Sequence, residues 1–128
     1  MVGVVVVSHS ERAAEGIVEV AAEMGGDARI EAVGGDPDGG LGTSMDAIRE
    51  GIEAAADGED AVVLVDLGSA VMNAEIAIEQ AGIEGDIKIA DAPVLEGAVN
   101  AAVEATSESA TVESVLEAAT DAREYRKL

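Results

Sequence analysis

The chain has 128 residues, of which 48% are hydrophobic, so we expect one core and a single domain over residues 1–128. Cysteine is absent, which excludes disulfides, thiolate nucleophiles and cysteine-based zinc sites. The 27 acidic residues against 7 basic ones give a formal net charge of -20, which argues against nucleic acid or an anionic membrane as a partner.

Strand-like and helix-like patterns alternate along the first third of the chain. Residues 2–7 form a continuous apolar run, typical of a strand that is covered on both faces. From residue 10 to residue 24 the apolar side chains recur at helical spacing, and Gly25-Gly26 ends this predicted helix. A weaker strand is predicted over residues 28–33, followed by a Gly-Asp-Pro loop over residues 34–42.

The same alternation continues to the carboxyl terminus. Thr43 or Ser44 is expected to cap the next helix, and Thr43 with Asp46 resembles a capping box. The remaining predicted elements are a strand over 61–65, a helix from about 69 to 81, a short strand over 86–92, and helices near 94–106 and 111–126.

This order predicts an α/β fold, with a single three-layer domain built on a four-stranded parallel sheet and helices on both faces. Right-handed crossovers favour the strand order 2-1-3-4. Ligands bind such sheets beyond the carboxyl ends of the strands, where the strand order reverses. Here that point lies between the first strand, which runs into Ser8-His9-Ser10, and the third, which runs into Asp66. We therefore expect the only histidine and a carboxylate to face each other.

This pair suits phosphoryl transfer. A neutral imidazole is a nucleophile toward phosphorus, and a carboxylate on one ring nitrogen fixes the tautomer and makes the other nitrogen more basic. Helix N-termini that follow the two strands favour a bound phosphoryl group. We expect His9 to be the phosphorylated nucleophile and Asp66 to orient it. The candidates for binding the phosphoryl oxygens are Ser8, Ser10, Thr43, Gly68 and Ser69.

Structural roles remain open for each of these residues. His9 could be a satisfied core histidine, and Asp66 could be a helix cap or a residue that orders its loop. Ser10 and Ser69 could be caps, and Ser8 with Glu11 could form a capping box. With one histidine and no cysteine we expect no metal site, and no motif points to a cofactor.

Three motifs occur in order along the chain: Val7-Ser8-His9-Ser10, Asp66-Leu67-Gly68-Ser69-Ala70 with Asn73-Ala74-Glu75, and Ala92-Pro93-Val94-Leu95-Glu96-Gly97. Together they resemble the DhaM family, whose domain is similar to the mannose-family enzyme IIA of the bacterial phosphotransferase system. DhaM is the phosphoryl-donor subunit of the phosphotransferase-dependent dihydroxyacetone kinase. The resemblance implies a phosphotransferase component in which Asp66 supports His9.

The resemblance also implies partners. The histidine would take its phosphoryl group from the carrier HPr, which enzyme I charges from phosphoenolpyruvate, and pass it to ADP on DhaL, which works with DhaK on dihydroxyacetone. The relatives are homodimers, and some carry further carrier and enzyme I-like domains. Here the chain ends at Leu128, so we expect HPr and enzyme I to be separate proteins.

Three other functions remain open. A mannose-type enzyme IIA that feeds a sugar transporter would use the same fold and histidine. A receiver domain would be phosphorylated on Asp66, but the acidic pair it needs after the first strand is replaced by Ser8-His9-Ser10. A small-molecule binding module would leave His9 without a role.

The acidic residues are spread along every segment, which indicates adaptation of the whole surface to a salt-rich cytosol, as in halophilic proteins. The amino terminus lacks the basic region of a signal peptide, and no apolar run approaches a membrane span. We therefore expect a soluble, cytoplasmic protein.

Overall fold

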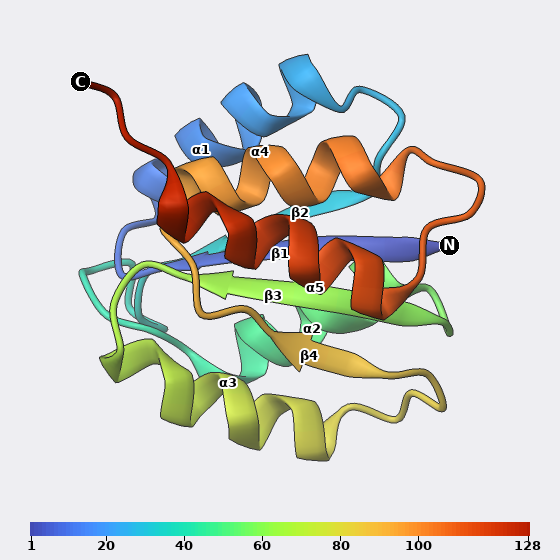
Figure 1. Ribbon diagram of the computed structural model, residues 1–128. Coiled ribbons are helices and arrows are strands. Elements are labelled where there is room, and N and C mark those ends of the chain that lie inside the picture. The colour runs from blue at the N-terminus through green and yellow to red at the C-terminus, as the bar shows by residue number, and fades with distance from the viewer.

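The computed structural model describes residues 1–128 as a parallel sheet between two layers of helices (Figure 1). The strands are β1 (Val2–Ser8), β2 (Ile30–Gly34), β3 (Asp60–Val65) and β4 (Ile87–Ile89). The helices are α1 (Glu11–Met24), α2 (Met45–Ala56), α3 (Ser69–Gln80), α4 (Val94–Ala105) and α5 (Val112–Asp121), and a short 3-10 turn, Ala122–Glu124, follows α5. The strand order is β2-β1-β3-β4, so the predicted fold class and strand order are confirmed.

The register of the sheet brings the ends of β1 and β3 side by side. Val7 pairs with Val65, and Ser8 pairs with Gly34 on the other side of β1. The chain continues this ladder by one more bond, since the backbone N–H of Asp66 donates to the carbonyl of Val7 at 3.0 Å. Asp66 therefore lies next to the residues that follow β1, as the switch-point rule predicts.

The core lies on both faces of the sheet and is built from small aliphatic side chains. Val4 and Val6 of β1 face α1, α4 and α5, whereas Val5 and Val7 face α2 and α3. All four are fully buried, as expected for a parallel strand covered on both sides. The helices meet the sheet largely through alanines, which lets a core without aromatic residues pack closely.

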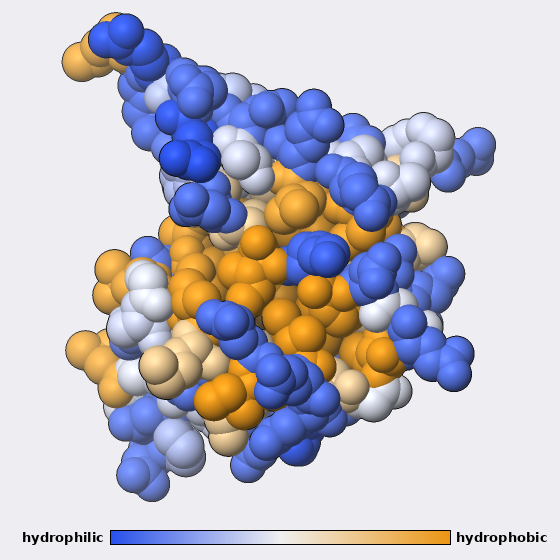
Figure 2. Space-filling model, turned by 60° about the horizontal axis from the view of Figure 1, so that its bottom comes forward, coloured by the Kyte–Doolittle hydropathy of each residue, from blue (hydrophilic) through white to orange (hydrophobic).

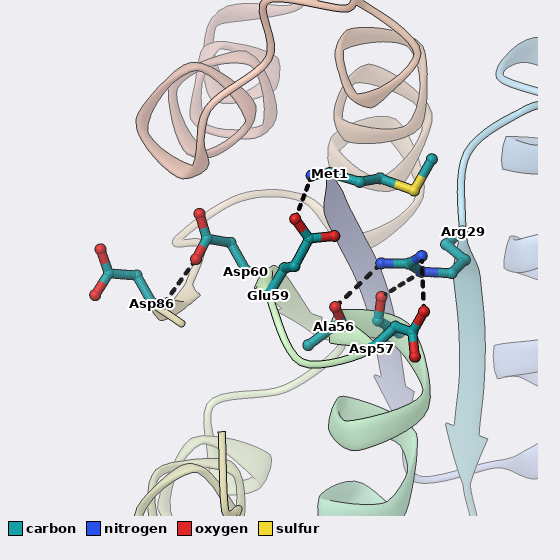
Figure 3. Close-up of polar contacts among 8 residues, drawn as sticks. Met1, Arg29, Ala56, Asp57, Glu59, Asp60 and Asp86 are labelled. Carbon is teal, nitrogen blue, oxygen red and sulfur yellow. Dashed lines mark hydrogen bonds and ion pairs between the residues drawn. The ribbon is translucent and has the colours of Figure 1, made fainter. Parts of the chain in front are cut away.

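Polar contacts close the end of the sheet that lies away from the carboxyl ends of the strands (Figure 3). Arg29, just before β2, donates to the carbonyl of Ala56 at 3.0 Å and forms an ion pair with Asp57 at 3.5 Å. A cation suits these last carbonyls of α2, which lack partners inside the helix. The amino group of Met1 pairs with Glu59 at 3.2 Å, which ties the start of β1 to the chain entering β3.

Neither of the two capping boxes that the sequence suggested is present. Ser44 caps α2 by accepting the N–H of Ala47, while the Thr43 side chain bonds elsewhere and Asp46 pairs with Arg49. Ser10, rather than Ser8 with Glu11, caps α1. In both cases two hydroxyl residues lie close together just before the helix, and only the backbone direction decides which of them reaches the free N–H groups.

The ends of two elements also differ from the prediction. β4 is only three residues long, because the neighbouring residues 86 and 90–92 leave the sheet after one further hydrogen bond on each side. α5 ends at Asp121 and tightens into the 3-10 turn, so the helix is shorter than the apolar spacing indicated.

Candidate functional site

One carboxylate at the end of β3 holds the residues at the end of β1. Asp66 Oδ1 lies 3.0 Å from His9 Nδ1, and Asp66 Oδ2 accepts both the Ser8 hydroxyl at 2.9 Å and the backbone N–H of His9 at 3.0 Å. The side chains of His9 and Asp66 are 27% and 21% exposed, so the pair is sheltered yet reachable from solvent. Asp66 thereby fixes both the backbone and the ring of His9.

These hydrogen bonds govern the ionisation of Asp66. Burial by itself would raise the pKa of the Asp66 carboxyl, but the hydrogen bonds from the His9 backbone, the His9 ring and the Ser8 hydroxyl outweigh it and lower the pKa below its ordinary value. Asp66 is therefore ionised at neutral pH. An ionised carboxylate only accepts hydrogen bonds, so the proton of the Nδ1 contact belongs to His9.

The other ring nitrogen of His9 points at α3. With the proton on Nδ1, the Nε2 atom of a neutral ring carries a lone pair and accepts a hydrogen bond from the Ser69 hydroxyl at 3.0 Å. Ser69 is the first residue of α3 and makes no capping bond there, since the N-cap position belongs to Gly68. Its alternative role as a cap is therefore wrong.

Two helices begin beside His9. The Ser10 hydroxyl caps α1 by accepting the N–H of Ala13 at 3.2 Å, and the Ser8 hydroxyl accepts the N–H of Ser10 at 3.1 Å. At the start of α3, Gly68 and Ser69 have backbone N–H groups without a backbone acceptor. These free N–H groups and the helix dipole favour an anion next to Nε2.

The loop between β2 and α2 is ordered by its own contacts and by His9. Asp36 accepts the N–H groups of residues 38 and 40 with one carboxylate oxygen. The N–H of Gly42 donates to the His9 carbonyl at 2.9 Å, and the φ of Gly42 is 141°, which favours glycine there. At the end of the loop the Asn73 side chain donates to Thr43 Oγ1 at 2.7 Å.

The structure brings together four of the predicted site residues: Ser8, His9, Asp66 and Ser69. Ser10 and Gly68 lie next to them at the starts of α1 and α3. Thr43 has no hydrogen bond to His9 and bonds Asn73 instead. Sequence reasoning gave Asn73 no role. Its spacing was a usable signal, because Asn73 stands four residues after Ser69 and so shares its face of the helix.

Two open pockets flank this arrangement. One, of about 510 Å³, lies against the first turns of α1 and the loop at Gly39–Leu41, and Arg12 is the basic side chain that lines it. The other, of about 560 Å³, starts at Asp66-Leu67-Gly68 and continues between α3 and β4 over mostly apolar side chains. His9 therefore stands between two surfaces that a partner could cover.

The chain is similar to a known protein family over most of its length. The family model for the PTS system fructose IIA component matches residues 3–116. A phosphoryl donor subunit DhaM of a PEP-dependent dihydroxyacetone kinase from Listeria innocua is 40% identical, over 81% of this chain and 86% of the relative. The DhaM subunit of Klebsiella michiganensis is 35% identical over 100% of this chain, which spans only 28% of that relative.

The fold has a counterpart among solved structures. A crystal structure described as the unknown-function protein EF1359 superposes with a TM-score of 0.79 at 28% identity, over 94% of this chain and 93% of that one. The match to the family model and the identity to the DhaM subunits cover the His9 and Asp66 segments together. The chain therefore belongs to the family of phosphotransferase-system fructose IIA components, among the DhaM phosphoryl donor subunits.

Proposed function

We propose that the protein is a phosphohistidine carrier that relays a phosphoryl group through His9. The observation that carries this proposal is the difference between the surroundings of the two ring nitrogens of His9. Nδ1 is held by the ionised Asp66, while Nε2 carries a lone pair beside a hydroxyl and free backbone N–H groups. This is the arrangement that a nucleophilic imidazole needs.

The nucleophile in this proposal is Nε2. Its lone pair attacks the phosphorus of the donor and forms the N–P bond, while the bond from phosphorus to the donor breaks and its electron pair leaves with the donor. The Nδ1 proton stays on the ring, and Asp66 stabilises the positive charge that develops there. The Ser69 hydroxyl then turns from Nε2 to a phosphoryl oxygen.

The proposed relay takes its phosphoryl group from the carrier HPr, and ultimately from phosphoenolpyruvate. It delivers the group to ADP on DhaL for phosphorylation of the dihydroxyacetone held by DhaK. Support comes from the relatives, which are named phosphoryl donor subunits of PEP-dependent dihydroxyacetone kinases. The proposed relay takes place in the cytoplasm, and residues 1–128 act in it as one domain. Separately, no helix of the structure is both long and apolar enough to cross a membrane.

A mannose-type enzyme IIA of a sugar transporter is the second candidate, because the family model that matches is that of the fructose IIA component. The same His9 and Asp66 would serve it. The two functions differ in the acceptor, so phosphorylated protein offered separately to DhaL with ADP and to a transporter's enzyme IIB distinguishes them.

The first test is the intact mass of the protein after incubation with phosphoenolpyruvate, enzyme I and HPr. We expect the wild type to gain one phosphoryl group that is lost in acid and retained in base, because a phosphohistidine is acid-labile. His9→Ala should gain none while keeping its fold, and Asp66→Ala should be phosphorylated more slowly. A phosphoryl group that His9→Ala still acquires would falsify the proposal, and base-labile modification would favour an acyl phosphate on Asp66.

A homodimer is part of the proposal, and its support is the surface around α3. This helix carries apolar side chains outside its buried face, with Met72 71% exposed and Val71 and Ile78 half-buried. β4 pairs with β3 on one side only, so its other edge is open. Figure 2 shows hydrophobic residues gathered in a broad patch on the face where α3 and β4 lie. A helix of this kind is normally covered, and a second copy would cover both elements.

A further inference from the structure

One side-chain hydrogen bond joins the loop before α2 to α3. Asn73 Nδ2 donates to Thr43 Oγ1 at 2.7 Å, across thirty residues of sequence. Both side chains are half-buried, and the bond is partly shielded from water. Thr43 is not needed to cap α2, because Ser44 does so. The hydrogen bond between Asn73 and Thr43 is therefore not needed to begin α2 and can have another role.

Each end of this contact adjoins a group that touches His9. Thr43 follows Gly42, whose backbone N–H donates to the His9 carbonyl at 2.9 Å. Asn73 lies one helical turn after Ser69, whose hydroxyl lies 3.0 Å from His9 Nε2. The hydrogen bond thus links the loop segment that contacts the His9 backbone to the helix segment that contacts the His9 ring.

The direction of the hydrogen bond fixes what Thr43 can do. A threonine hydroxyl has one proton to donate and two lone pairs, and the amide nitrogen of Asn73 occupies one of those lone pairs. No protein group accepts the Thr43 proton in the structure. Phosphoryl oxygens are acceptors only, so a hydroxyl whose proton is kept free is suited to bind them.

We infer that Asn73 is a positioning residue that keeps the Thr43 hydroxyl in its donating orientation, so that Thr43 donates to the phosphoryl group carried by His9. The inference rests on the proposed function. It gives Thr43 the phosphoryl-binding role that the sequence predicted, and it explains why Thr43 bonds Asn73 rather than His9 in the unphosphorylated protein.

The test reverses the hydrogen bond without changing its shape. In Asn73→Asp the carboxylate accepts the Thr43 proton and takes it away from the phosphoryl group. Thr43→Val removes the hydroxyl, Thr43→Ser keeps it, and the double variant Thr43→Val with Asn73→Asp measures the coupling. Asn100→Asp makes the same chemical change on α4, where Asn100 bonds Ala118 and Tyr125 away from His9.

The rate of phosphorylation is measured on the full chain with phosphoramidate, a small donor that needs no protein partner, and the phosphohistidine signal is followed by phosphorus NMR. We expect Thr43→Val and Asn73→Asp each to react roughly ten- to a hundredfold more slowly, the usual effect of losing one hydrogen bond to a charged group. Asn100→Asp should react like the wild type, and Thr43→Ser, which keeps the hydroxyl, should react faster than Thr43→Val. In the Thr43→Val background, Asn73→Asp should add almost nothing.

The added negative charge of Asn73→Asp could slow the reaction without involving Thr43, and the double variant separates the two causes. An equal loss from Asn73→Asp in both backgrounds overturns the inference, as does a Thr43→Val variant that reacts at the wild-type rate. If Asn73→Asp unfolds, the phosphorylation rate of Asn73→Ala is measured instead, alone and combined with Thr43→Val. An equal loss of rate in both backgrounds again overturns the inference. A wild-type protein that phosphoramidate cannot modify would instead count against the proposed function itself.

Discussion

At the scale of single residues, the site depends on how many groups share Asp66. The carboxylate accepts the Ser8 hydroxyl, the His9 backbone and the His9 ring at once. It therefore sets the ring angle, the tautomer and the end of β1 together, and it keeps the buried Ser8 hydroxyl satisfied. Asp66 therefore both orders its loop, a role that the sequence left open, and pairs with His9.

The lowered pKa of Asp66 predicts how its contribution to stability depends on pH. A carboxyl whose pKa is lower in the folded protein stabilises it above the ordinary pKa and loses this effect as the pH falls through the lowered value. At neutral pH, Asp66→Asn should reduce the free energy of unfolding by about 1.5–3 kcal/mol, the usual range for hydrogen bonds to a charged group.

Urea denaturation of wild type and Asp66→Asn at several pH values measures this effect. Because the other acidic residues titrate in both proteins, the informative quantity is the difference between the two free energies of unfolding. That difference should shrink as the solution is made acid, and a difference that stays constant would assign the loss to packing rather than to charge.

At the scale of elements, small residues decide how closely helices approach the sheet. Gly97 in α4 is buried, and a Cβ added there would lie 2.6 Å from Leu64 Cδ2 and 3.0 Å from Ala92 Cβ. Leu64 is fully buried in β3 and has little room to move. The absence of a side chain at residue 97 therefore sets the distance between α4 and the strand that leads to Asp66.

Gly97→Ala should consequently destabilise the protein, because overpacking a core costs about 1–3 kcal/mol and the gain in helix propensity offsets at most about 1 kcal/mol. Gly16→Ala is the matched control, because Gly16 is also inside a helix but a Cβ there meets nothing within 4 Å. It should be neutral or stabilising by about 0.5–1 kcal/mol through helix propensity. Melting curves of the two variants compare them, and equal destabilisation would mean that the α4–β3 distance does not depend on residue 97.

At the scale of the whole molecule, the excess of negative charge is the feature with the largest expected effect on stability. The formal net charge is -20, and the ion pairs between side chains are surface contacts such as Arg123 with Asp91 and Arg49 with Asp46. Pairs of this kind add little stability, so most of the acidic residues repel one another without compensation. The protein should therefore be less stable in low salt than in high salt.

Salt should raise the melting temperature and favour the proposed dimer. Between about 0.1 M and 1 M salt the screening length falls from about 10 Å to about 3 Å, which weakens repulsion both within a chain and between two copies. Thermal unfolding and sedimentation over this range measure both effects. A melting temperature that is independent of salt would contradict the salt-adapted interpretation, and a monomer in high salt would contradict the dimer.

The sequence by itself determined the order of the elements, the parallel sheet and the place of His9. These follow from local patterns, because a buried parallel strand is continuously apolar and a helix repeats every three to four residues. The switch point between β1 and β3 then needed only the strand order, and so the pairing of His9 with Asp66 could be predicted across 57 residues.

Only the tertiary structure decided which atoms meet. It placed Asp66 on Nδ1 and left Nε2 to Ser69, gave the α2 cap to Ser44 and not Thr43, and turned Thr43 toward Asn73. The physical reason is that hydrogen bonds depend on fractions of an ångström and on the direction of each donor. Residue spacing defines which faces and ends come together, whereas these directions are fixed only once the helices have packed against the sheet.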